Sequence, residues 1–322
     1  MGNGVVLLID SATTAGYNTF YIYRKNGCAR ENLPMQQTEK IAVITDTCCD
    51  LPRAIFKQYP IFCVPLVVTC GTESYRDNID IEVEEIYARQ KAEDFKTSLP
   101  RPQDIADVYD AVARQGYTHV VVLMIAECLS SANNLMRLAA EEHPELTVRV
   151  FDSKSASIGL GALAVQTARY IDEGMSFDAL CTRVERLITD TVVWFSLDTL
   201  EYLQRGGRIG RATALAGSLL QIKPVLTFDR ADGMISTAAK VRGRRAVQPK
   251  LLELAQALVA AHPGEAYNLV VCDGNVPEEG AALEKALLHA LPDARHVLHG
   301  QIDATLAVHL GPNLLGVGVQ FI

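Results

Sequence analysis

HVVVLMIA, residues 119–126, is the stretch of this chain that does most to determine its fold class. A nearly continuous apolar run of this length is typical of a strand that is covered on both faces, as in a parallel sheet. The segment 132–142 that follows it predicts a helix, and the runs IAVIT (41–45) and TVRVF (147–151) predict two more strands. Because strands alternate with helices, we predict an α/β domain with a doubly wound, mainly parallel sheet.

The other N-terminal segments continue this alternation. A helix is expected to open at Leu51–Pro52, since proline suits the first helical position, and a rigid loop is expected at 96–102. The remaining predicted elements are a strand at 61–69 and helices at 80–91, 103–113, 159–173 and 177–189.

Beyond residue 191 the order of the elements is mixed and predicts an α+β domain. Strands are expected at 192–197, 267–273, 295–300 and 316–321, a hairpin at 222–228 and 234–241, and helices at 246–261 and 276–291. We therefore expect an N-terminal α/β domain at 41–190 and a C-terminal α+β domain at 191–322. Residues 1–40 are predicted to be an extension outside the core, with an alternative translation start at Met35; the other interpretation is a genuine extra strand at Val5–Ile9.

Composition and charge narrow the class of protein. The 322 residues carry a net charge of −8, which argues against general nucleic-acid binding because that depends on many Lys and Arg side chains. The eight cysteines contain no C-x-x-C pair, so neither a zinc site nor a thioredoxin-type motif is indicated, and a reducing, cytoplasmic compartment is expected. No apolar run approaches the roughly 20 residues of a membrane span. We expect no metal and no cofactor.

A second informative stretch is DTLEYLQRGGRIGRATALAGSLLQIKPVL, residues 198–226. A short helical pattern breaks at Gly206–Gly207, where the backbone can take conformations closed to other residues, and a second, apolar helix is expected at 213–220. Three arginines surround the bend, namely Arg205, Arg208 and Arg211. They predict an anion-receiving surface. The simpler interpretation, a helix C-cap followed by a solvated basic turn, fits this stretch equally well.

Residues 159–164 fit the pattern G-x-G-x-x-A of dinucleotide-binding proteins. No acidic residue about 20 positions later ends a second strand, as the ribose contact requires. Close packing of a helix through small residues is therefore the favoured interpretation, and nucleotide binding stays as an alternative.

Hydroxyl side chains lie at predicted strand-to-helix junctions. Thr97–Ser98 precedes a proline-stiffened loop, and Ser130–Ser131 follows the strand at 119–126. Their positions alone favour helix N-caps. The carboxyl ends of parallel strands are also where open α/β sheets bind ligands, and hydroxyls with free helix amides hold carboxylates or phosphates. His309 can reach the same place from the second domain, although a lone histidine is more often structural.

Together these segments resemble the DegV family of bacterial fatty-acid-binding proteins. IAVITDTCCDLP (41–52) is similar to the opening strand and turn of that family, TSLPRP (97–102) to its T-S-Q-P-S-P loop, and HLGPNLLG (309–316) to its H-T-G-P-G-A-L-G segment. FDSKSASIGLG (151–161) resembles its D-S-x-x-x-S-x-G-x-G segment, and LEYLQRGGRIGRATALAGSLLQIKPVL (200–226) is the strongest match. The likeness covers about residues 41–322.

The resemblance implies a long-chain fatty acid in an apolar tunnel between the two domains. It assigns the carboxylate of that fatty acid to four side chains, Thr97, Ser98, Ser130 and His309. A fatty-acid kinase would phosphorylate the bound carboxylate, with Arg208 and Arg242 facing the partner or the developing phosphate charge. On this interpretation the protein is a lipid-binding carrier without catalysis of its own.

The chain departs from the family pattern in one loop. Where the family commonly has S-S-G-L-S-G-T-Y, residues 126–133 read AECLSSAN, so one serine survives and Glu127 brings a negative charge near a carboxylate site. The alternative function is a stand-alone α/β enzyme that acts on a small anionic substrate, with Ser98, Ser130 or His309 as the catalytic residue.

Overall fold

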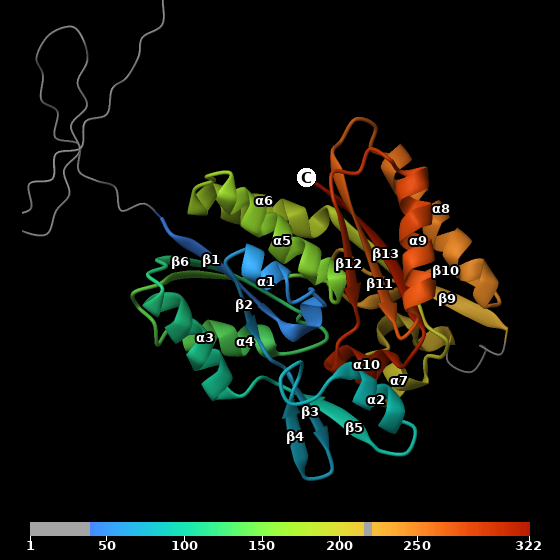
Figure 1. The fold of residues 1–322 in the computed structure, drawn as a ribbon, viewed down its shortest axis with the longest axis horizontal. Coiled ribbons are helices and arrows are strands. Elements are labelled where there is room, and N and C mark those ends of the chain that lie inside the picture. Colours follow the sequence, from blue (N-terminus) through green and yellow to red (C-terminus); the bar gives the residue numbers. More distant parts are fainter. Residues whose placement is uncertain (1–38, 216–220) are drawn as a thin grey trace, which may run out of the picture. The chain divides into compact units, whose positions relative to one another are not determined.

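A computed structural model describes residues 39–215 and 221–322, and residues 41–322 form one compact unit (Figure 1). The predicted N-terminal extension lies outside the described residues except at its end. The helix predicted at 213–220 lies mostly outside them as well. Its described start belongs to a 3-10 helix, η2 (Gly210–Leu215).

A parallel sheet forms the first half of this unit. It contains β1 (Ile41–Asp46), β2 (Ile61–Val64), β6 (His119–Met124) and β7 (Thr147–Asp152). Their order is β2-β1-β6-β7, and every neighbouring pair is parallel. β1 and β6 are buried along almost their whole length because helices cover both faces of the sheet, so the predicted doubly wound α/β arrangement is confirmed.

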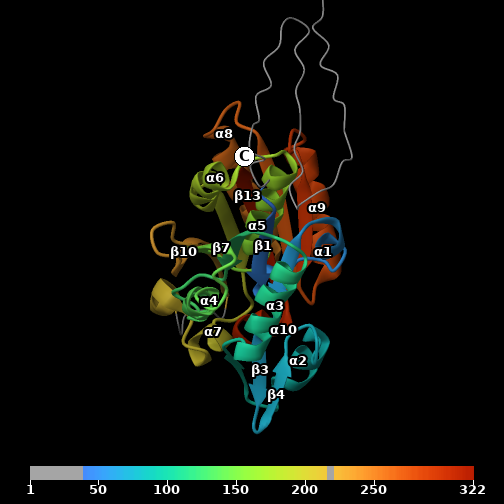
Figure 2. The ribbon, with the colours of Figure 1, turned by 90° about the vertical axis from the view of Figure 1, so that its left-hand side faces the viewer.

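Two N-terminal predictions are wrong because the chain leaves the parallel sheet at Pro65. The predicted strand at 61–69 is two strands, β2 and β3 (Val67–Cys70), and proline between them has no N–H with which to continue a ladder. The predicted rigid loop at 96–102 begins as a strand, β5 (Phe95–Ser98). With β4 (Glu73–Arg76), these segments form a separate antiparallel sheet in the order β4-β3-β5 (Figures 1 and 2).

The N-terminal helices follow the predicted pattern, with ends that differ from the predicted ones by at most three residues. They are α2 (Val83–Arg89), α3 (Pro102–Arg114), α4 (Ala132–Ala140), α5 (Ile158–Asp172) and α6 (Phe177–Thr189). The helix predicted to open at Leu51–Pro52 is instead α1 (Ile55–Gln58), preceded by the 3-10 helix η1 (Thr47–Cys49). Its start is displaced because the Pro52 carbonyl and the Ile55 N–H close a turn first.

The second half contains a mixed sheet of six strands. These are β8 (Thr191–Ser196), β9 (Ile222–Phe228), β10 (Ile235–Arg242), β11 (Tyr267–Gly274), β12 (Val297–Gln301) and β13 (Leu314–Phe321). The order is β10-β9-β8-β13-β11-β12, in which β11 and β12 are parallel and the other neighbours antiparallel. The helices are α7 (Glu201–Arg205), α8 (Val247–Ala260), α9 (Pro277–Ala290) and α10 (Ala304–Leu310), with the 3-10 helix η3 (Arg244–Ala246). The predicted α+β character and the β9–β10 hairpin are confirmed.

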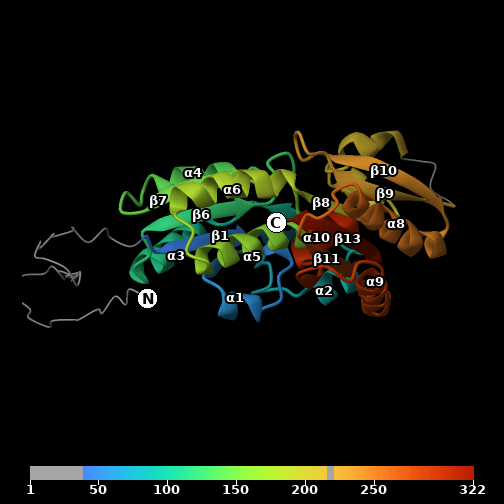
Figure 3. The same cartoon turned by 90° about the horizontal axis from the view of Figure 1, so that it is seen from above.

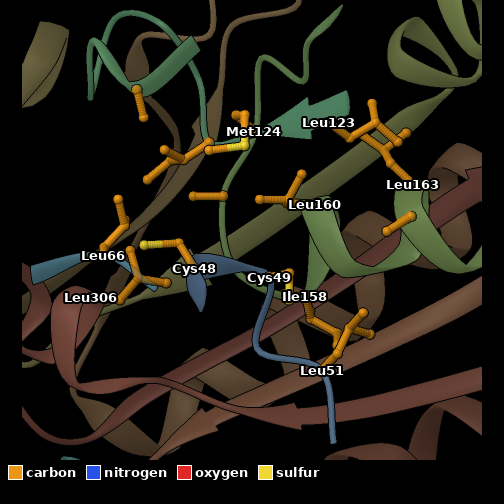
Figure 4. Close-up of a cluster of buried hydrophobic side chains, with 14 of the residues drawn as sticks. Cys48, Cys49, Leu51, Leu66, Leu123, Met124, Ile158, Leu160, Leu163 and Leu306 are labelled. Atoms are coloured by element: carbon orange, nitrogen blue, oxygen red, sulfur yellow. The ribbon is translucent and has the colours of Figure 1, made fainter. Parts of the chain in front are cut away.

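Helix α5 packs against both the parallel sheet and the mixed sheet. It contacts β1, β2 and β6 of the parallel sheet and β8, β11 and β12 of the mixed sheet (Figures 1 and 3). A side chain at Gly161 would collide with the Cys49 carbonyl, and Figure 4 shows Ile158 of this helix beside Leu51. The glycines at 159–164 therefore serve close packing of a buried helix, which is the interpretation that the sequence favoured. The predicted division near residue 190 stays a prediction.

Candidate ligand-binding cavity

A cavity of about 380 Å3 lies between the parallel sheet, the mixed sheet and α10. Its wall is mostly apolar and includes Leu66, Ile125, Phe195, Phe228, Ile235 and Leu306. An apolar, largely preformed cavity with few polar groups is typical of a site for a hydrophobic small molecule, because the polar groups orient the ligand and the apolar wall supplies affinity.

All four residues predicted to hold a carboxylate line this cavity. Thr97 and Ser98 end β5, Ser130 lies between β6 and α4, and His309 is in the last turn of α10. The Thr97 hydroxyl and His309 Nε2 are 2.7 Å apart and hydrogen-bonded, although 212 positions separate them in sequence. They meet because α10 packs directly on β5 and β3 of the small antiparallel sheet.

His309 is held neutral at physiological pH. Burial, together with the positive charges of Arg208 and Arg205, lowers the pKa of its imidazole from 6.5 to about 4. A neutral imidazole carries one N–H donor and one acceptor nitrogen. His309 therefore serves the cavity as a hydrogen-bonding group and not as a fixed positive charge.

The glycine bend makes room for this imidazole. His309 Nδ1 lies against Gly206, where any side chain would overlap the ring, and Nδ1 has no hydrogen-bond partner among the described residues. The neighbouring Gly207 has a φ of +71°, which disfavours other residues. One glycine is thus required by a close approach and the other by backbone conformation. The bend is more than the plain helix cap that the sequence left open.

Arg208 brings a positive charge to the cavity wall. Its Nε donates to the Leu129 carbonyl at 3.3 Å and its Nη1 to the Gly206 carbonyl at 2.7 Å. These bonds tie the bend after α7 to the loop that carries Ser130. The Ser130 hydroxyl in turn accepts from the Ala132 N–H at 3.3 Å, so this serine makes a local helix-start contact and also lines the cavity.

Two charged residues from the sequence prediction lie away from the cavity wall. Arg242 is exposed at the end of β10, where it donates to the Gln221 side chain at 2.8 Å. Glu127 forms an ion pair with Arg137, so its negative charge is balanced outside the cavity.

Sequence reasoning did not single out Ser157, which precedes α5 and lines the cavity. Its hydroxyl donates to Asp50 Oδ2 at 2.5 Å, and Asp50 Oδ1 accepts from the Asp303 N–H at 2.8 Å. Asp77 accepts from the next two amides of α10, those of Ala304 and Thr305. The available signal in the sequence was the two aspartates of IAVITDTCCDLP, Asp46 and Asp50, but the sequence alone did not connect them to α10.

Within residues 39–215 and 221–322, no three His, Cys, Asp or Glu side chains are grouped so that they can hold a metal ion. None of the helices in the same ranges combines the length and the apolar character needed to cross a bilayer.

The fold and the cavity define a class of α/β proteins with three sheets that enclose an apolar site with a polar end. The chain belongs to the DegV family, whose model, described as uncharacterised proteins, matches residues 40–321. A DegV domain-containing protein of Clostridium perfringens is 33% identical over 286 residues, which are 88% of this chain and 99% of the relative.

Solved structures give the same result. A DegV family protein from Thermus thermophilus, described with fatty acid binding, has 32% identity and a TM-score of 0.80 over 88% of this chain and 100% of its own. A stearic-acid-binding protein from Eubacterium ventriosum has 29% identity and a TM-score of 0.80 over 87% and 98%. DegV of Bacillus subtilis, a fatty acid binding protein, has 27% identity and a TM-score of 0.79 over 88% and 100%. The family resemblance derived from the sequence motifs is confirmed.

Proposed function

We propose that this protein binds a long-chain fatty acid in the cavity, with the carboxylate at its polar end. The observation that carries the proposal is the Thr97–His309 hydrogen bond in the wall of an otherwise mostly apolar cavity. The hydroxyls of Ser98 and Ser130 line the same cavity and serve as further donors to the carboxylate. The ligands described for the Eubacterium and Bacillus proteins support this assignment.

The apolar wall supplies most of the affinity in this proposal. Burial of a methylene group gains roughly 0.8 kcal/mol, so about ten buried methylenes gain roughly 8 kcal/mol before the entropic costs of binding. The neutral His309 and the hydroxyls then orient the head group, while the Arg208 guanidinium balances its negative charge. This division of roles is the usual one for an apolar ligand with a single polar end.

Lipid extraction and native mass spectrometry of the purified protein test the binding proposal. We expect a co-purified fatty acid, and we expect Thr97→Val to weaken binding of added palmitate or oleate about tenfold, because one hydrogen bond to a charged group is lost. Thr69→Val is the matched control, since Thr69 lies on the neighbouring strand β3 and outside the cavity wall. A lipid-free protein that also fails to bind added fatty acid would contradict the proposal.

We further propose that the bound carboxylate is presented to a fatty-acid kinase and phosphorylated there. Arg208 suits this step because it lines the cavity and retains N–H groups beyond the two that bind carbonyl oxygens. The exposed Arg242 is assigned to the surface that meets the kinase. On this proposal the protein supplies the substrate and the kinase supplies the catalysis.

A coupled assay with a fatty-acid kinase, ATP and the lipid-loaded protein tests the second proposal. Arg208→Ala is expected to reduce ADP release at least tenfold with much of the lipid still bound, and Arg242→Ala to reduce it without any change in lipid binding. Arg114→Ala, an exposed position at the end of α3, is the control. Equal ADP release from all three variants would refute the proposed roles of both arginines.

A further inference from the structure

Ser157 lines the cavity and hydrogen-bonds to the buried Asp50, and the proposed carboxylate site does not use this polar pair. Both have positive φ values, +56° for Ser157 and +52° for Asp50, and the ψ of Ser157 is −149°. That combination at Ser157 is occupied almost only by glycine and is strained for a residue with a side chain. Glycine would relieve this strain, so the serine hydroxyl is kept at a conformational cost.

The pair lies at some distance from the carboxylate end. The Asp303 N–H donates to Asp50, and Asp303 is the N-cap of α10. His309 follows six positions later along the helix, a rise of about 9 Å at 1.5 Å per residue. Thr305, Leu306, His309 and Leu310 all line the cavity, so α10 runs along its wall between the two polar places. A ligand with its carboxylate at His309 therefore meets Ser157 along its hydrocarbon chain.

The hydrogen-bonding capacity of Ser157 defines what it can receive. A hydroxyl has one proton and two acceptor lone pairs, and the proton of Ser157 is directed to Asp50 Oδ2. Its lone pairs can accept a hydrogen bond from a ligand hydroxyl. Asp50 is buried, and its other carboxyl oxygen already accepts from the Asp303 N–H.

We propose that Ser157, oriented by Asp50, is a subsite for a hydroxyl group carried part-way along the acyl chain, so that the preferred ligands include hydroxy fatty acids. This proposal rests on the proposed fatty-acid binding function and specifies its ligand class. Burial of a ligand hydroxyl against an apolar wall without a hydrogen-bond partner weakens binding, whereas a partner at the right place makes that burial favourable. Sites built to pair a ligand hydroxyl discriminate strongly against analogues that lack it.

Competition binding to the delipidated full-length chain tests this proposal with three ligands of equal length. They are stearic acid, a mid-chain hydroxystearic acid and the matching oxostearic acid, each measured by displacement of a fluorescent fatty acid. Scanning the hydroxyl along the chain locates the best position. We expect at least one mid-chain hydroxy acid to bind five- to tenfold more tightly than stearic acid, and the oxo acid, which has no proton to donate, to bind no better than stearic acid.

Ser157→Ala removes the acceptor and is expected to abolish the preference. Ser157→Gly removes it as well and suits the positive φ, so it replaces the alanine variant if that chain folds poorly. Thr69→Val is the matched control, because Thr69 lies on β3 and outside the cavity wall. It should leave the preference unchanged.

Two results would overturn the subsite. One is equal affinity for stearic acid and every mid-chain hydroxy acid; the other is a preference that persists in both Ser157 variants. Oxo acid binding as tight as that of the hydroxy acid would also overturn it, because Ser157 would then act as a donor. Failure to bind any fatty acid would instead contradict the proposed function, so the two failures are distinguishable.

Discussion

Replacement of His309 by glutamine tests whether the cavity uses a neutral imidazole. Burial lowers the pKa of His309 to about 4, so the folded protein keeps the ring unprotonated at pH values where the unfolded chain takes up a proton. The stability linked to this group is therefore complete above 6.5, the ordinary pKa of histidine, and is lost progressively as the pH falls toward 4. Glutamine keeps a donor and an acceptor but has no group that titrates in this range.

The expected effect follows from the two pKa values. Between about pH 7 and about pH 5, a shift from 6.5 to about 4 removes about 2 kcal/mol of unfolding free energy from the wild-type protein. Urea unfolding of wild type and His309→Gln at both pH values measures this loss of unfolding free energy. The loss equals the change in the stability gap between the two proteins from one pH to the other. That design cancels the titration of the buried carboxyl groups, which both proteins share. Fatty-acid affinity at about pH 7 should change by less than about threefold in the glutamine variant, because one neutral hydrogen-bonding group replaces another.

His309→Ala is the comparison, since it removes the partner of Thr97 Oγ1 altogether. We expect about a tenfold loss of fatty-acid affinity from that variant. A stability gap between wild type and His309→Gln that is the same at both pH values would refute a lowered pKa. Equal loss of affinity in the glutamine and alanine variants would show that a charged imidazole is needed, and the reasoning for a neutral ring would be wrong.

Three further predictions concern packing and charge. Gly206→Ala should displace the His309 ring and weaken fatty-acid binding at least tenfold, as seen in displacement titrations, whereas Gly207→Ala should lower stability by about 1 kcal/mol through its positive φ and leave affinity nearly unchanged. Gly161→Ala should destabilise the protein by about 1–3 kcal/mol in urea unfolding, because the added carbon meets a backbone carbonyl; a neutral result would contradict the close packing of α5. Hydrogen bonds to the carboxylates of Asp273 and Glu284 raise the pKa of His299, and the bond to Asp273 has the larger effect. The stabilising contribution of His299 is therefore present below about pH 6.5 and is lost as the pH rises through the raised pKa. The stability gap between wild type and His299→Gln should accordingly be larger at about pH 6 than at about pH 9, and a gap independent of pH would count against this ion pairing.

Much of the fold was predictable because its elements have strong local signals. The apolar run at 119–126 and the helix at 177–189 needed little tertiary context, and both are found as β6 and α6. The predictions failed where one residue interrupts a local pattern. Pro65 divides an apolar run between two sheets, and the segment around Thr97 forms a strand only because β3 lies beside it. A strand that depends on its neighbour has no independent signal.

The residues proposed to hold the fatty-acid carboxylate were named from a resemblance, whereas the contacts between them came from the structure. Sequence placed Thr97 and His309 in motifs of one family, but hydrogen bonding between them depends on α10 packing against β5. The same holds for Arg208, which the resemblance assigned to the partner or to the developing phosphate charge and which the structure places in the cavity wall. Ser157 was missed because its role depends on backbone strain and on a carboxyl group 107 positions away.

The sequence by itself determined the alternation of strands and helices, the buried character of the parallel strands, and the family. These properties depend on side-chain periodicity and on short motifs, which are local. Only the tertiary structure decided that β13 inserts between β8 and β11, that α5 packs on both sheets, and that the polar groups of the cavity meet at two separate places. Such contacts join residues far apart in the chain, and their free energy depends on burial and hydrogen-bond geometry that exist only once the whole chain has folded.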